Sequence, residues 1–415
     1  MISYVRLFVL SVFFLLGFAT SAFAADEEEQ SNPLASLPLR HIGPAITSGR
    51  ISDFAFYPGG DNKFLVGVAS GNLFRTDNSG ITWDPLFDNE ESYAIGVVEL
   101  DPNDTKTIWV GTGENNAQRS VANGDGVYKS TDGGKNWTNV GLKDSGHISQ
   151  IWINPDDSNE VLVAAQGPLW NDGGDRGLYR TTDGGATWNR ILNIDAHTGV
   201  NEFVVDPRNP DVIVASTYQR RRHVWVLING GPGSGIHKST DRGKTWNEIS
   251  AGLPGDHMGR IGLAGAPSDP DMIYAIIEAN DDEKGIYRST DFGSNWEKRS
   301  DYMTTSPQYY NEIVVDPKNE NRLYSLNTFT MKSEDGGETF TALTAESRHV
   351  DDHALWIDPE NTDHLYIGGD GGIYESWDMG NTWRHIRNLS ITQFYRIQPD
   401  YDEPFYNVCG GTQDN

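Results

Sequence analysis

Residues 130–137 read Ser-Thr-Asp-Gly-Gly-Lys-Asn-Trp, and this short stretch recurs along the chain. Further copies occupy residues 76–83, 181–188, 239–246, 289–296, 333–340 and 376–383, the copy at 333–340 ending in Phe. Their aspartates are Asp77, Asp132, Asp183, Asp241, Asp291, Asp335 and Asp378, about 50 residues apart. The first copy carries one extra residue between its Asp and its Trp. A period of this length predicts a repeat architecture.

The residue types in this stretch are those of a tight turn. Glycine permits positive φ, and Asp and Ser/Thr oxygens accept hydrogen bonds from the N–H groups of the turn. The closing aromatic ring can anchor the outgoing strand between neighbouring sheets. We therefore predict that the seven aspartates have a structural role.

A second repeated element lies between these turns. Asp-Pro-x-Asn-like sequences, which favour tight turns, follow short β-rich runs at residues 101–103, 154–156, 206–209, 316–319 and 358–361. Each repeat then reads strand A, proline turn, strand B, variable loop, strand C, Asp turn, strand D. This order predicts an all-β fold, a seven-bladed β-propeller with four-stranded antiparallel blades over residues 44–391.

The composition excludes some functions. The 415 residues include 59 acidic and 32 basic side chains, a formal charge of −27, which disfavours binding to nucleic acid. A lone Cys409 cannot form an internal disulfide, and no Cys/His cluster suggests zinc. We predict no cofactor and no metal.

The N-terminus has the pattern of an export signal. Arg6 precedes an apolar run over residues 7–18, and Ala22-Phe23-Ala24 has the small-x-small pattern of a cleavage site. We predict a signal peptide over residues 1–24, with a retained anchor as the alternative, and an acidic, flexible lead-in over 25–43. No membrane span is expected after cleavage. Export without disulfides favours a bacterial periplasmic, cell-surface or secreted protein.

The C-terminal residues 392–415 resemble another A–B strand pair without a strand C or an Asp turn. They either close the ring or begin a further blade. Because an open sheet edge is a liability, we favour a C-terminal continuation of the protein.

The strand order places the A–B and C–D turns on one face and the B–C loops and D–A connections on the other. The second face carries the segments that do not repeat, where binding residues are expected. Candidate ligand-binding residues in these segments are Glu114, Asn115, Asn116, Arg119, Trp170, Asp175, Arg176, Tyr218, Arg220, Arg222, Arg260, Tyr309, Tyr310, Asp352 and His353.

The Asp turn resembles the Asp-box, or BNR, repeat of sialidases, sortilins and propeller glycoside hydrolases. From about residue 39 to 415, the loops and the sequence at 410–415 are similar to large exported bacterial proteins with a sortilin N-terminal or glycosyl hydrolase domain. Xyloglucanase-type enzymes have a catalytic Asp in a Thr-Asp-x-Gly-Gly stretch. Residues 369–372, Gly-Asp-Gly-Gly, are similar, so the resemblance implies Asp370 as a catalytic candidate. The resemblance to xyloglucanases also implies that a second catalytic carboxylate comes from a second propeller. The Arg-Ile-Pro signature of sialidases is absent from this sequence, which disfavours sialidase activity.

Two charged segments have alternative interpretations. Residues 220–223, Arg-Arg-Arg-His, form either a clamp for an acidic peptide or uronate, or partners for neighbouring acids. His349, Asp351, Asp352 and His353 contain metal-ligand types, but adjacent strand residues point to opposite faces, so we predict no metal site there. The hypothesis is a propeller that binds a glycan or peptide on the variable face. The alternative is a glycoside hydrolase.

Overall fold

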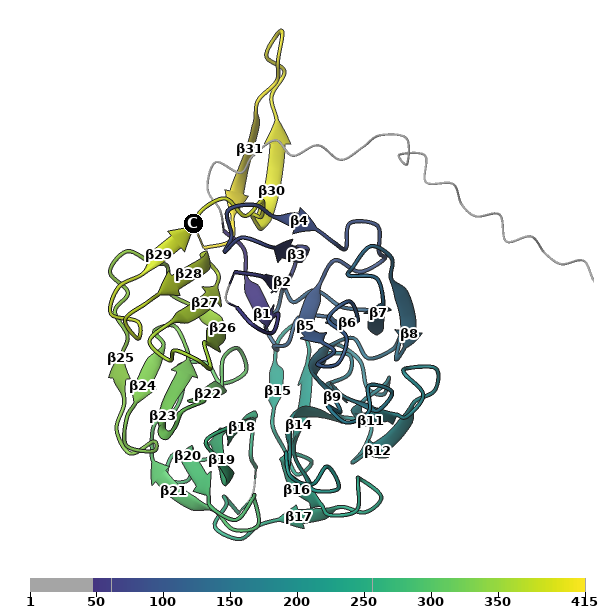
Figure 1. Ribbon diagram of the computed structural model, residues 1–415, viewed down its shortest axis with the longest axis vertical. Coiled ribbons are helices and arrows are strands. Elements are labelled where there is room, and N and C mark those ends of the chain that lie inside the picture. Colours follow the sequence, from purple (N-terminus) through teal and green to yellow (C-terminus); the bar gives the residue numbers. More distant parts are fainter. Residues whose placement is uncertain (1–47, 61, 256, 415) are drawn as a thin grey trace, which may run out of the picture. The chain divides into compact units, whose positions relative to one another are not determined.

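The computed structural model describes residues 48–60, 62–255 and 257–414. In this part of the chain every regular element is a β-strand (Figure 1). Seven antiparallel sheets, each built from consecutive strands, form the blades of a β-propeller, and a further pair of strands forms its own small sheet. The seven-bladed propeller predicted from the repeats is therefore confirmed. The predicted signal peptide (1–24) and lead-in (25–43) lie outside the described residues.

The strands follow each other in chain order from the inner to the outer edge of each blade. Blade 1 contains β1 (Ile51–Phe56), β2 (Phe64–Val68), β3 (Asn72–Thr76) and β4 (Asp84–Pro85). Blade 2 contains β5 (Ile95–Leu100), β6 (Ile108–Thr112), β7 (Val127–Ser130) and β8 (Thr138–Gly141). Blade 3 contains β9 (Ile148–Ile153), β10 (Val161–Ala165), β11 (Gly177–Thr181) and β12 (Asn189–Leu192). Blade 4 contains β13 (Thr198–Val205), β14 (Ile213–Arg222), β15 (Leu227–Asn229), β16 (Gly235–Ser239) and β17 (Asn247–Ile249). Blade 5 contains β18 (Ile261–Ala266), β19 (Asp269–Ile277), β20 (Gly285–Ser289) and β21 (Glu297–Ser300). Blade 6 contains β22 (Glu312–Asp316), β23 (Asn319–Leu326), β24 (Met331–Ser333) and β25 (Thr341–Ala342). Blade 7 contains β26 (Asp352–Ile357), β27 (Leu365–Gly369), β28 (Gly372–Ser376) and β29 (Arg384–Ile386).

The repeated turns join the third and the outermost strand of each blade. In blade 2, the Ser130 hydroxyl accepts the N–H of Gly134 at 2.9 Å, and Asp132 Oδ1 accepts the N–H of Asn136 at 3.0 Å. The same two bonds recur around Asp183, Asp241, Asp291, Asp335 and Asp378. The turn residues thus hydrogen-bond to one another within eight positions, as the local chemistry predicts.

The turn of blade 1 differs from the prediction. Asn78 Oδ1, not Asp77, accepts the N–H of Thr82 at 2.8 Å, because Asn78 stands two residues after Thr76, as Asp132 stands two residues after Ser130. Asp77 is half-exposed and lies 3.4 Å from Lys63 Nζ, as a surface ion pair. The structural role predicted for Asp77 is therefore wrong.

The closing tryptophans tie each blade to its neighbour. The indole N–H of Trp137 donates to Leu86 O at 2.8 Å, and that of Trp188 donates to Val140 O at 2.8 Å, in each case in the preceding blade. Trp83 of blade 1 reaches Asn388 Oδ1 beyond blade 7 at 3.4 Å. Blade 7 therefore meets blade 1 directly, and Figure 1 shows β1 beside β26.

The last two strands, β30 (Phe394–Pro399) and β31 (Val408–Thr412), pair with each other in a sheet of their own. The side chains of this hairpin are largely exposed, including Tyr401 at 93% and Phe405 at 83% in the turn between the two strands. In the described part of the chain, no helix has the length and apolar character needed to cross a bilayer.

Candidate functional site

The variable loops converge on one face and line a pocket of about 520 Å³. We call this pocket the mouth pocket. Its lining comes from the segment before β1, the β6–β7 loop, the β21–β22 connection, the β23–β24 turn, the segment before β26, the β27–β28 turn and the β30–β31 hairpin. The lining residues are Arg50, Gln118, Arg119, Ser120, Ser306, Tyr309, Tyr310, Thr328, Asp351, Asp370, Tyr395, Gln413 and Asp414.

Arg50 is the hub of this face. Its Nε and Nη2 donate to the two carboxylate oxygens of Asp370 at 2.7 and 3.1 Å. Its remaining donors reach Glu114 and the hydroxyl of Tyr309, and the guanidinium lies 4.7 Å from the Tyr309 ring centre. Arg50 precedes blade 1, and its partners come from blades 2 and 7 and from the β21–β22 connection, so this buried network ties together four segments that are distant in the sequence.

The glycines around Asp370 allow its loop to pack closely. A Cβ on Gly369 would lie 2.1 Å from Asp351 O, and one on Gly371 would lie 2.1 Å from the Cβ of His349. Both contacts are too short for any other residue without rearrangement. The Gly-Gly-Asp-Gly-Gly sequence therefore presses Asp370 against the 349–351 segment.

The charge state of this cluster follows from its partners. Burial by itself raises the pKa of Asp370, but the charge and hydrogen bonds of Arg50, together with His353 and Asp414, hold that pKa below its usual range. Burial and the hydrogen bond with Asp370 raise the pKa of Asp414. Burial lowers the pKa of His353 to about 3, so this imidazole is neutral at physiological pH.

A second arginine hub lies at the channel side of the same loops. Arg260 Nη2 donates to Glu312 at 2.9 Å, and Nε donates to Asn201 at 3.3 Å. Asn115, a predicted ligand-binding residue, donates from Nδ2 to Glu312 at 3.3 Å. Arg260 is fully buried, so it holds the loops together instead of facing a ligand.

Several predicted binding residues are buried in the same way, and the structure corrects their assignment. Arg220 donates to Asn116 O and Gly167 O, and Arg222 donates twice to Ala117 O. Arg176 is likewise buried and donates to Gln166 O at 2.8 Å. Because Arg220 and Arg222 are buried and donate to backbone carbonyls, these two side chains do not form a clamp at the surface. Tyr218 is buried, and its hydroxyl donates a hydrogen bond to Asn229. The Asp352 carboxylate accepts a hydrogen bond from Arg348 at 2.6 Å. The Asn116 amide donates a hydrogen bond to the Glu114 carboxylate. The alternative interpretation holds for Arg221, which pairs with Asp172.

Other candidates remain accessible. Arg119 is exposed and lines the mouth pocket with Tyr309, Tyr310 and Asp370. Trp170 is 37% exposed and lines a separate pocket of about 380 Å³, and Asp175 is half-buried and accepts the N–H of Asp144 at 3.0 Å. The ring of His353 contacts those of Tyr309 and Tyr310, with centre distances of 4.5 and 5.3 Å, and the two tyrosine rings lie 4.7 Å from each other.

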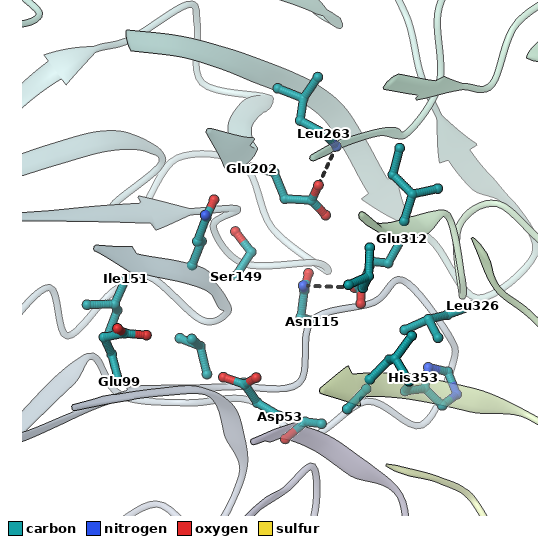
Figure 2. A pocket seen from close by; sticks show the side chains of 18 residues that line it. Asp53, Glu99, Asn115, Ser149, Ile151, Glu202, Leu263, Glu312, Leu326 and His353 are labelled. Atoms are coloured by element: carbon teal, nitrogen blue, oxygen red, sulfur yellow. Dashed lines mark hydrogen bonds between the residues drawn. The ribbon is translucent and has the colours of Figure 1, made fainter. Parts of the chain in front are cut away.

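The central channel contains a second cavity, of about 280 Å³. Figure 2 shows Asp53, Glu99, Glu202 and Glu312 around it. Burial raises the pKa of Asp53 to about 7 and those of Glu99 and Glu202 to about 8. Some of these acids also join blades: Asp53 accepts the N–H of Val98 at 2.8 Å, and Glu202 accepts that of Leu263 at 2.5 Å. These channel acids were not among the predicted site residues.

Arg50, Asp351 and Asp414 of the mouth pocket were also missed. A signal for Arg50 was present, because Gly49-Arg50-Ile51 repeats as Gly259-Arg260-Ile261, each before the first strand of a blade. No local pattern marks Asp414, whose place in the pocket depends on where the terminal hairpin lies.

Comparisons with known proteins agree with this architecture. The family model for sortilin–Vps10 proteins (sortilin, neurotensin receptor 3) matches residues 125–231 and 178–328. A probable oligoxyloglucan-reducing end-specific xyloglucanase of Neosartorya fischeri is 26% identical over 296 residues, which covers 65% of this chain and 31% of the relative. A xyloglucanase of Acetivibrio thermocellus is 22% identical over 370 residues, covering 72% and 41%. The chain spans less than half the length of these relatives.

Solved structures show the same fold. The GH74 xyloglucanase from Xanthomonas campestris has a TM-score of 0.64 at 16% identity, covering 88% of this chain and 58% of that one. YCF48 bound to D1 peptide has a TM-score of 0.51 at 16% identity, covering 80% and 94%. Fold and loop face thus define a repeat-built, seven-bladed β-propeller. Within that class, the chain is similar to sortilin–Vps10 proteins over residues 125–328 and to xyloglucanases over longer stretches.

Proposed function

We propose that this propeller binds a glycan in the mouth pocket. The observation that carries the proposal is the lining of this pocket, in which the exposed Tyr395 and Arg119 accompany Gln118, next to the largely buried Tyr309 and Tyr310. Aromatic rings pack against the apolar faces of sugars, and polar groups at fixed positions bind their hydroxyls. The similarity to xyloglucanases supports a glycan over a peptide and makes xyloglucan oligosaccharides the first ligands to test.

Calorimetric titration with xyloglucan oligosaccharides tests this proposal. Arg119→Ala and Tyr395→Ala should each weaken binding about tenfold, equal to about 1.4 kcal/mol. Lys135→Ala is the matched control, because this exposed cation lies in the repeated turn of blade 2, outside the pocket. Saturable binding to peptides but not to any glycan, or equal affinities for all three variants, would refute the proposal.

A second candidate function is glycoside hydrolysis, favoured by the xyloglucanase similarity and by the place of Asp370 in the pocket. Both oxygens of Asp370 accept hydrogen bonds, from Arg50 and from the Tyr309 hydroxyl at 2.9 Å. An oxygen pair held in this way serves as a carboxylate base and not as a proton donor. The acid of a two-carboxylate mechanism would then come from another part of the protein. Unchanged glycan hydrolysis in the Asp370→Asn variant would eliminate this role.

We also propose that the protein is exported. The proposal rests on the charged, apolar and small-residue pattern over residues 1–24. N-terminal sequencing of the protein from its native host should give a mature chain that begins near Ala25. A mature protein that still begins at Met1 would contradict cleavage.

A further inference from the structure

Three carboxylates meet at one side of the mouth pocket. Asp351, Asp370 and Asp414 each offer an oxygen, and these oxygens all lie within 4.8 Å of one another. The residues come from the segment before β26, from the β27–β28 turn and from the end of the terminal hairpin. Carboxylates at this distance repel each other strongly unless a cation or a proton lies between them.

The positive charge nearby does not balance this cluster. Arg50 pairs with Asp370, but it also pairs with Glu114, so one guanidinium faces four carboxylates. Arg119 lines the same pocket at its exposed side. The cluster therefore keeps an excess of negative charge.

A nearby histidine supplies an independent observation. His353 Nε2 has no hydrogen-bond partner among the described residues, although its side chain is only 10% exposed. This nitrogen lies 3.7 Å from Asp370 Oδ1, which is too far for a hydrogen bond. The imidazole packs in a cluster with the rings of Tyr309 and Tyr310. A buried imidazole nitrogen without a partner is costly unless something else binds it.

The sequence predicted no metal site among His349, Asp351, Asp352 and His353, because adjacent strand residues point to opposite faces. Asp352 and His353 do have different partners: Asp352 binds Arg348 and Thr330, whereas His353 lies beside Asp370. Asp351 lies just before β26 with a φ of +68°, so the strand alternation does not set its direction, and its carboxylate lies near that of Asp370. Asp370 and Asp414 complete the group from distant parts of the chain.

We propose that Asp351, Asp370 and Asp414 bind one divalent cation, beside the unpartnered ring nitrogen of His353. Carboxylate oxygens suit Ca²⁺ and Mn²⁺, and a neutral imidazole nitrogen nearby favours Mn²⁺ over Ca²⁺. The pocket side of the cation would remain open to water or to ligand hydroxyls. This inference does not depend on glycan binding, because the three carboxylates that define the site all come from the protein.

Titration of the EDTA-treated, dialysed chain with MnCl₂ or CaCl₂, without glycan, tests the site. We expect one cation per chain with a Kd of about 0.1–1 mM or tighter. The electron paramagnetic resonance signal of free Mn²⁺ should fall in proportion. Asp351→Asn and Asp414→Asn should each weaken binding at least about tenfold, since each removes one charged ligand. Asp402→Asn, an exposed change in the same hairpin, should bind as the unaltered protein does.

Two results would overturn the proposal. One is the lack of saturable binding of either cation up to about 10 mM, beyond the weak end of extracellular calcium sites. The other is equal cation affinity in the unaltered chain and both Asn variants, with cooperative unfolding showing that the variants are folded. Since glycan titrations can be repeated in EDTA, failure of the metal site and failure of glycan binding are separable.

Discussion

Glu99 in the central channel provides a direct test of how the propeller tolerates buried charge. Burial, with a contribution from Asp53, raises the pKa of Glu99 from its ordinary value of 4.5 to about 8. A carboxyl whose pKa is higher in the folded than in the unfolded protein binds more protons when folded. Its contribution to stability is therefore fully present below about pH 4.5 and is lost as the pH rises towards 8.

The size of the effect follows from the pKa shift. Each pKa unit corresponds to about 1.4 kcal/mol, so the full shift sets an upper limit of about 5 kcal/mol. The Glu99 side chain retains some contact with solvent in the channel, which screens its charge. We expect the free energy of unfolding to fall by about 2 kcal/mol between about pH 5 and about pH 9 on account of this residue.

The assay is urea unfolding at a series of pH values, followed by tryptophan fluorescence. Glu99→Gln mimics the protonated side chain, so this variant should match the unaltered protein near pH 5 and exceed its stability by about 2 kcal/mol near pH 9. Glu346→Gln is the matched control, because Glu346 is exposed. The reasoning is refuted if Glu99→Gln and the unaltered protein lose stability equally as the pH rises.

Other predictions concern the turns, the arginine hub and the hairpin. Ser130→Ala should lower the free energy of unfolding by about 1–2 kcal/mol, measured in urea, because the buried hydroxyl accepts the Gly134 N–H. Asp77→Asn should change the free energy of unfolding by less than about 0.5 kcal/mol, since Asp77 takes no part in the hydrogen bonds of the turn. A large loss of stability would contradict the assignment of Asn78 as the acceptor in this turn. Arg50→Met should cost about 3–5 kcal/mol by leaving two buried carboxylates unpaired, and a calorimetric melting point equal to that of the unaltered protein would exclude this hub role. If residues 394–412 begin a further blade, their amide hydrogens should exchange more slowly in a longer protein that contains the C-terminal continuation than in this chain, and equal exchange would argue against it.

The sequence by itself determined the elements and their order. The turn around Asp132 forms from hydrogen bonds among eight consecutive residues, so its chemistry is readable in one short stretch. Seven such stretches, spaced by proline turns and β-rich runs, leave few alternatives to a propeller. The same local reading failed at Asp77, because Asn78 and not Asp77 occupies the acceptor position of this turn.

The composition of the mouth pocket was decided only by the tertiary structure. Arg50 and Asp370 are 320 positions apart and meet because blade 7 closes against blade 1. Arg220 has the residue type of a surface clamp, but carbonyl groups from the loops of blades 2 and 3 turn it inwards. Whether a loop side chain is free or buried depends on which other loops cover it, and that is a property of the closed ring and not of any single repeat.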